Sequence, residues 1–116
     1  MRHSFETVWH AVALAVAQRV TCPRLQVGAV VVGPDNQIIS TGYNGAPRGE
    51  PHCIDVGCEI EANHCIRVVH AEVNALLQAG PRAKGATLYC THKPCARCTA
   101  IIKNAGIVRA LYLQEY

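Results

Sequence analysis

Two short motifs contain the residue types that bind metals and move protons. The first, Pro94-Cys95-Ala96-Arg97-Cys98, follows a predicted strand and begins a predicted helix, so its two thiols lie close together at the first turn. The positive end of a helix stabilises the thiolate, which is the form that binds metal. A pair of this spacing also fits a redox couple or two buried thiols, but the position at a helix start favours zinc.

The second motif, His70-Ala71-Glu72, begins another predicted helix after an irregular segment. Residues two apart in mid-helix point roughly 200° apart, whereas at the first turn both side chains can reach a site beyond the helix end. We therefore expect His70, Cys95 and Cys98 to hold one zinc ion and to leave its fourth position open for water. Glu72 would then accept the proton of that water; its alternative role is a solvated acid favoured by the helix dipole.

Hydrophobic periodicity and turn residues predict the elements that position these motifs. An amphipathic helix is expected from about Phe5 to Val20 with Ser4 as its cap. Two strands, 25–32 and 37–41, flank a turn at 33–36 and predict an antiparallel hairpin. The segment from 42 to about 67 loses periodicity and collects Gly, Pro, His and Cys, which predicts a long irregular excursion of functional importance.

Regular structure resumes after the excursion. A helix is expected at 69–79 and is stopped by Gly80-Pro81, followed by a strand at 86–90, a helix at 95–104 and a strand at 107–113. Right-handed crossovers make the last two strands parallel, so the central sheet is expected to be mixed.

Size and charge limit the classes of protein. With 116 residues, we expect a single domain that spans 1–116. The net charge of +3 is mild and its basic residues are scattered, which argues against a nucleic-acid arm or a membrane patch but allows a small anionic ligand. We see neither an apolar run of the about 18 residues that a spanning helix needs nor an export signal, so we expect a cytoplasmic protein. Its seven cysteines, an odd number, are then expected to be reduced and to serve metal or catalysis.

H-x-E followed by P-C-x-x-C is the signature of zinc-dependent nucleobase deaminases, and both motifs are complete here. From about Cys22 onward the chain resembles the deoxycytidylate (dCMP) deaminases, through Gly28-Ala29-Val30, the Ser40–Pro47 segment, the Cys-rich excursion and the His70–Ala75 segment. The resemblance implies the three-layer α/β/α cytidine deaminase fold with a mixed sheet. It also implies hydrolysis of dCMP to dUMP and ammonia, with Glu72 as base towards water and then as acid towards N3 and the departing amine.

Candidate substrate-binding residues follow from the same resemblance. It implies that Asn44 hydrogen-bonds the sugar or the base edge, although Asn44-Gly45 is also typical of a tight turn. The 5′-phosphate needs cationic donors, for which Arg48 and Arg24 are candidates; either could equally be a surface charge.

Five cysteines remain beyond the catalytic motif. Cys90 lies in a predicted strand and is interpreted as a core residue. The excursion is too poor in apolar residues to pack by itself, so a structural zinc closed by four ligands would hold it together. The resemblance implies such a second zinc, with Cys22 and Cys53 as ligands and Cys65 with either Cys58 or His64 completing the set. Free thiols or a redox-sensitive pair are the alternative.

Two other functions remain open at this point. A deaminase of another base, such as tRNA adenosine, would be expected to need a larger basic surface. A purely structural zinc module would have no use for Glu72 beside an open coordination position. Similar enzymes usually continue past the strand ending near Leu113 with a further helix and strand. Without them, an edge of the sheet or part of the substrate pocket is left for another subunit to cover, so we expect a homo-oligomer. Its expected ligand is a small nucleotide, and we expect it to bind neither nucleic acid nor membrane.

Overall fold

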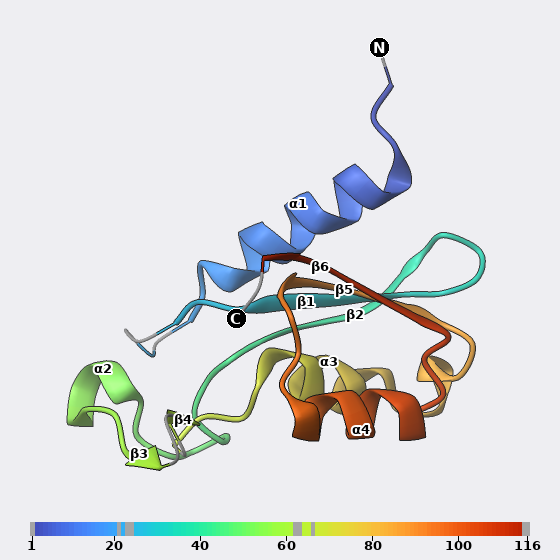
Figure 1. Cartoon of the computed structure of the whole chain (residues 1–116). Helices are drawn as coiled ribbons and strands as arrows, with labels where there is room; N and C mark the ends of the chain where they lie inside the picture. The colour runs from blue at the N-terminus through green and yellow to red at the C-terminus, as the bar shows by residue number, and fades with distance from the viewer. Residues whose placement is uncertain (1, 21, 23–24, 62–63, 66, 115–116) are drawn as a thin grey trace.

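A four-stranded sheet lies between helices in the computed structural model of the chain (Figure 1). The structure describes all residues except 1, 21, 23–24, 62–63, 66 and 115–116, and of His64 the backbone alone. The strand order is β2-β1-β5-β6, with bounds β1 Gly28–Val32, β2 Ile38–Tyr43, β5 Thr87–His92 and β6 Arg109–Gln114. The helix α1 covers one face, and α3 and α4 cover the other, with bounds Phe5–Ala17, Ala71–Ala79 and Ala96–Asn104. The predicted α/β/α sandwich is confirmed.

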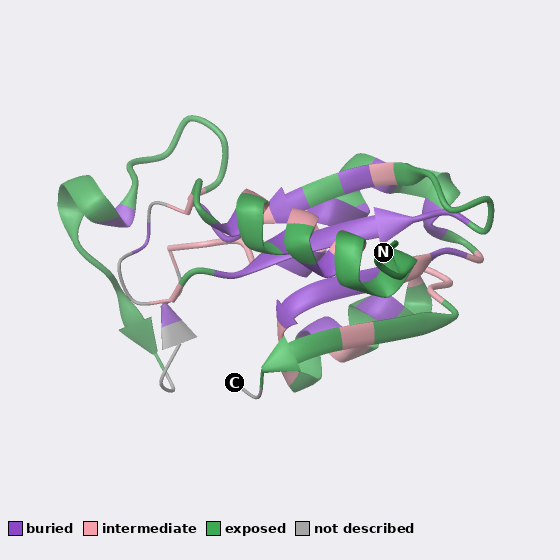
Figure 2. Cartoon of the chain, turned by 90° about the horizontal axis from the view of Figure 1, so that it is seen from above, coloured by how far each residue is buried: buried purple, intermediate pink, exposed green. Residues whose placement is uncertain are grey.

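The sheet is mixed, as expected. β1 pairs antiparallel with both β2 and β5, whereas β5 and β6 are parallel. All five residues of β1 are buried, because helices cover both faces of the sheet at this strand and its sequence, GAVVV, is apolar throughout. β6 is different: five of its six residues are exposed, at the edge of the sheet (Figure 2).

Helix α1 starts where the sequence predicts and ends earlier. The Ser4 side chain accepts a hydrogen bond from the Thr7 backbone N–H at 3.1 Å, which is the expected cap. The helix ends at Ala17, not near Val20, and its buried residues are His10, Ala13 and Ala17. Small residues face the sheet because α1 runs so close to Gly28 that a Cβ there would lie 2.0 Å from the Ala13 carbonyl oxygen. The larger apolar residues Phe5, Val8 and Leu14 are exposed.

Helix α3 lies equally close to the opposite face. A Cβ on Gly42 of β2 would lie 2.3 Å from the Ala71 carbonyl oxygen and 2.4 Å from the Ala75 backbone nitrogen. The hydroxyl of Ser40 donates to the Ala75 carbonyl oxygen at 2.7 Å and strengthens this contact. The glycine in β2 therefore fixes the height of the α3 N-terminus above the sheet. After Ala79 the chain continues as a 3₁₀ turn, Gly80–Ala83.

The excursion is more ordered than its composition predicts. β2 continues to Tyr43, and the segment contains a short helix α2 (Cys53–Val56) and a two-stranded hairpin of β3 (Ile60–Glu61) and β4 (His64–Cys65). Its base is closed by paired backbone hydrogen bonds between Gly45 and Val69. The expectation of an irregular segment from 42 to 67 was therefore wrong in part, because short-range backbone pairing needs no hydrophobic periodicity. Within the described part of the chain, none of the helices has the length and hydrophobicity that a membrane crossing requires.

Candidate active site

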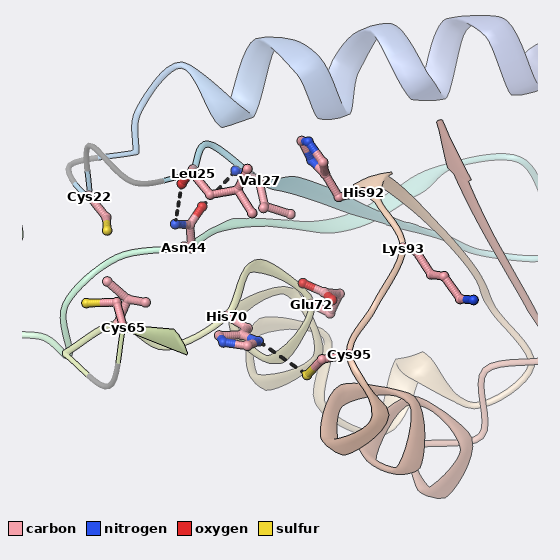
Figure 3. Close-up of a pocket in the computed structure, with 11 residues that line it drawn as sticks. Cys22, Leu25, Val27, Asn44, Cys65, His70, Glu72, His92, Lys93 and Cys95 are labelled. Atoms are coloured by element: carbon pink, nitrogen blue, oxygen red, sulfur yellow. Dashed lines mark hydrogen bonds between the residues drawn. The ribbon is translucent and has the colours of Figure 1, made fainter. Parts of the chain in front are cut away.

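The N-termini of α3 and α4 bring three metal-binding side chains together. His70 is the N-cap residue of α3 and Cys95 that of α4, while Cys98 lies in the first turn of α4. The Nδ1 atom of His70 is 3.2 Å from the Cys98 sulfur and 3.7 Å from the Cys95 sulfur. Figure 3 shows His70 and Cys95 pointing towards one another. The convergence of two helix starts, expected from the sequence, is what the structure has.

The donor set and its dimensions fit zinc. One imidazole nitrogen and two thiol sulfurs, with ligand atoms all within 4.8 Å of one another, are a usual set for a tetrahedral site. Bonds of about 2.0 Å to nitrogen and 2.3 Å to sulfur give tetrahedral edges of roughly 3.5 Å, close to the distances found. Burial, and then the nearby Glu72 carboxylate, raise the pKa of the Cys98 thiol, so a cation is needed to hold it as thiolate. Three protein ligands leave a fourth position for water or substrate.

Glu72 lies beside these ligands in the second position of α3 and is 4 % exposed. Burial raises the pKa of its carboxyl group, and hydrogen bonds from its own backbone and from Cys98 offset this only in part. A buried carboxylate whose pKa is raised is a stronger base than an exposed one, which suits a group that accepts a proton. The position next to an open metal site therefore gives Glu72 the properties of a general base and acid.

These residues line one pocket (Figure 3). Glu72, His70 and Cys95 form one side of it, and the segment before β1, the end of β2 and the end of β5 form the rest. The other described residues of its lining are Cys22, Leu25, Val27, Asn44, Cys65, Val68, His92 and Lys93. A wider cavity of about 510 Å³ lies against the same metal-binding residues on the side of α4 and is lined by Arg97 and Ile101, but not by Glu72. The pocket that contains Glu72 is therefore the one where proton transfer can occur.

Asn44 lies in this pocket and is already engaged by the backbone. Its side-chain oxygen accepts from the Val27 N–H at 2.8 Å, and its amide nitrogen donates to the Leu25 carbonyl oxygen at 2.8 Å. The side chain thus holds the approach to β1 in place and keeps one N–H and one lone pair for a substrate. Of the two arginines predicted to bind phosphate, Arg48 is exposed and does not line the pocket, and Arg24 lies outside the described residues.

Four further cysteines form a second cluster. The sulfurs of Cys22, Cys53, Cys58 and Cys65 all lie within 4.8 Å of one another, with 3.5 Å between Cys22 and Cys58 and between Cys53 and Cys65. These distances are close to the sulfur–sulfur edge of a tetrahedral zinc site, roughly 3.8 Å. Of the two alternatives for the fourth ligand, the structure places Cys58 in the cluster, while the side chain of His64 lies outside the described part.

The environment of Cys65 also suits metal binding. Burial raises its pKa, but backbone hydrogen bonds at Glu59 and Arg67, together with hydrogen bonds to the Cys53 and Cys58 thiols, lower the pKa to about 7. A thiol with this pKa is partly ionised at neutral pH, as a zinc ligand must be. Cys22 and Cys65 belong both to this cluster and to the lining of the Glu72 pocket, so the four-cysteine cluster forms part of one wall of the candidate active site.

The sequence analysis missed His92 and Lys93 in the pocket lining. Both come at the carboxyl end of β5, directly before Pro94-Cys95. Ligands of α/β proteins commonly bind at the carboxyl ends of strands, so position in the fold was the available signal.

The chain is similar to known proteins along almost its whole length. The family model "Cytidine and deoxycytidylate deaminase zinc-binding region" matches residues 4–114. The chain is 43 % identical over 118 residues to ComE operon protein 2 of Bacillus subtilis, and the match covers 99 % of this chain and 62 % of that protein. It is 39 % identical over 127 residues to deoxycytidylate deaminase of Mycobacterium phage D29, with 98 % of each chain covered.

A solved structure extends the likeness to the fold. The crystal structure of dCMP deaminase from the cyanophage S-TIM5 in complex with dCMP and dUMP has a TM-score of 0.84 to this chain at 34 % identity. The alignment covers 100 % of this chain and 85 % of that one.

Proposed function

Because the chain belongs to the zinc-binding cytidine and deoxycytidylate deaminase family, we propose that it hydrolyses dCMP to dUMP and ammonia. The observation that carries the proposal is the buried Glu72 carboxyl group beside a His-Cys-Cys group at two helix N-termini. The named activity of the phage D29 relative, and the dCMP and dUMP bound to the cyanophage enzyme, support the substrate.

The residues of the site have separate tasks in this reaction. His70, Cys95 and Cys98 would hold the zinc ion, which would supply the Lewis acidity that makes water a nucleophile at neutral pH. Glu72 takes one proton from the attacking water and passes it to N3 of the cytosine ring. It then transfers the second proton to the exocyclic amine, which leaves C4 as ammonia. Because burial raises the pKa of Glu72, its carboxylate is a better proton acceptor than an exposed one.

Asn44 is placed to orient the nucleotide. Its two backbone hydrogen bonds fix the side chain, so the remaining N–H and lone pair have a defined direction towards the sugar or the base edge. Because Arg48 is exposed and does not line the pocket, we do not assign the phosphate to it.

The four-cysteine cluster is proposed to hold a second, structural zinc. Four sulfurs close a tetrahedral site and leave no position for water, which is typical of a structural role. The ion would tie α2 and the β3–β4 hairpin to the segment before β1, in a region whose described residues have few other buried apolar side chains.

Assembly and location are also proposals. β6 is an edge strand with exposed Tyr112 and Leu113, and Val108 just before it is 71 % exposed, so a second copy of the chain would cover an apolar surface there. All seven cysteines have free thiols, which fits a reducing compartment such as the cytoplasm.

A UV-monitored assay over dCMP, dCTP, CMP, deoxycytidine and an adenosine substrate tests the function. We expect dCMP to be turned over, and Glu72→Ala to lose more than the about 10²- to 10⁴-fold that a single proton-transfer group contributes, since Glu72 also orients the water. Turnover of none of the cytosine substrates, or unchanged turnover in the variant, would refute the proposed reaction or mechanism.

A further inference from the structure

The cationic side of the pocket comes from the end of β5. Of the described residues that line the pocket, Lys93 is the only lysine or arginine, and Glu72 is the only acid. Next to Lys93, His92 contributes a half-buried imidazole to the same lining. A nucleotide carries its negative charge on the phosphate, so this is the part of the pocket with matching chemistry.

A chain of two hydrogen bonds holds the His92 ring in place. The Gly28 backbone N–H donates to the Thr91 hydroxyl oxygen at 3.1 Å, and that oxygen is 2.9 Å from His92 Nδ1. Since the hydroxyl oxygen already accepts from Gly28, its own proton is available to Nδ1. Burial lowers the pKa of His92, which favours the neutral ring. A neutral ring that accepts from Thr91 at Nδ1 carries its proton at Nε2, where it can donate to a phosphate oxygen.

Lys93 is anchored at its backbone and exposed at its side chain. Its N–H donates to the Gln114 carbonyl oxygen at 2.8 Å, which ties the residue to β6. Figure 3 shows its side chain extending away from His70 and Cys95, from the same end of β5 that carries His92. When the base of a nucleotide reaches Glu72, its phosphate stays towards solvent, because it is the most strongly hydrated part of the molecule.

We propose that His92 and Lys93 form the subsite for the 5′-phosphate and so make the enzyme prefer nucleotides to nucleosides. Lys93 supplies the charge, and His92 supplies an imidazole ring that is held in place by its contact with Thr91. The inference rests on the proposed function and assigns a role that the sequence had given to Arg48 or Arg24.

Two other described cations are less well placed. Arg48 lies on an exposed loop and does not line the pocket. Arg97 lines the wider cavity on the side of α4, which lacks Glu72. Both provide controls of matched charge.

The test compares kcat/KM for dCMP with that for deoxycytidine. We expect Lys93→Met to lower the ratio about 10- to 100-fold, as the loss of a hydrogen bond to a charged group does. Lys93→Arg should restore most of the preference, and Arg48→Met and Arg97→Met should leave it within about twofold of wild type. An unchanged ratio in Lys93→Met, or an equal loss in either arginine variant, would overturn the inference.

A binding experiment separates this inference from the proposed function. Calorimetry with dUMP and deoxyuridine measures the phosphate preference without turnover. We expect the wild type to bind dUMP more tightly and Lys93→Met to lose about 10- to 100-fold of that preference, with circular dichroism confirming an unchanged fold. If the wild type deaminates no cytosine substrate, the function fails while binding still decides the subsite. If the wild type binds both ligands equally, the subsite is refuted.

Discussion

Gly42→Ala tests how the sheet positions the catalytic helix. A Cβ at this position would lie 2.3 Å from the Ala71 carbonyl oxygen and 2.4 Å from the Ala75 nitrogen, whereas ordinary contacts begin at 3.4 Å. The atoms in the way are backbone, so α3 as a whole must retreat by about 1 Å to restore normal contact. The bond from the Ser40 hydroxyl to the Ala75 carbonyl oxygen, now 2.7 Å, would lengthen with it.

The expected cost follows from this displacement. Overpacking of a core costs about 1–3 kcal/mol, and immovable backbone atoms place this substitution near the upper end. His70 and Glu72 are at the N-terminus of α3 and move with it, while Cys95 belongs to α4. A misplacement of about 1 Å costs on the order of 10²-fold in rate, so activity should fall more than stability alone explains.

Urea unfolding and the dCMP assay measure the two effects. Gly45→Ala is the matched control, because a Cβ there would meet nothing closer than 3.5 Å, from the Tyr43 ring. We expect the control to stay within about 1 kcal/mol of wild type and to keep its activity. If Gly42→Ala behaves like Gly45→Ala in both assays, the close approach of α3 does not position the site and the reasoning fails.

Three further predictions concern stability and metal content. His10 packs edge-on against Tyr89, and burial lowers the pKa of its imidazole. The folded state therefore disfavours the imidazolium, so the free energy of unfolding should decrease as pH falls below the unfolded-state pKa of 6.5. His10→Phe should remove this part of the pH dependence in thermal melts from pH 8 to 5. Metal analysis after dialysis should find two zinc ions per chain and one in Cys53→Ser; one in the wild type would discard the structural site. Thr91→Val should cost about 1–3 kcal/mol in denaturant unfolding because it leaves the buried Gly28 N–H without its acceptor, and a loss below about 0.5 kcal/mol would contradict this.

The grouping of His70, Cys95 and Cys98 was predictable because it depends on local position at two helix starts. His70 and Cys95 each stand directly before a helix, where the pattern of turn and apolar residues already indicated a helix start. The four strands of the sheet and the helices that cover it were predicted correctly as strands and helices. The errors concern the residues at which these elements begin and end. α1 stops at Ala17 because the chain must turn towards Gly28, a tertiary constraint that periodicity does not contain.

Residues whose role depends on distant contacts were not predictable. Spacing could not choose between Cys58 and His64, because the four sulfurs meet only after the excursion folds back on the segment before β1. In the sequence, nothing distinguishes Lys93 from other exposed lysines. Its place at the end of β5 brings it into the lining of the pocket that contains Glu72. Asn44 lines the pocket, but its bonds to the 25–27 segment connect residues far apart in the chain and could not be predicted.

Anomalous diffraction at the zinc edge tests the central claim most directly. We expect a zinc peak about 2.0–2.3 Å from His70 Nδ1 and from the sulfurs of Cys95 and Cys98, with the Glu72 carboxyl group facing the fourth position. A disulfide between Cys95 and Cys98, or a His70 ring turned away from both sulfurs, would contradict it.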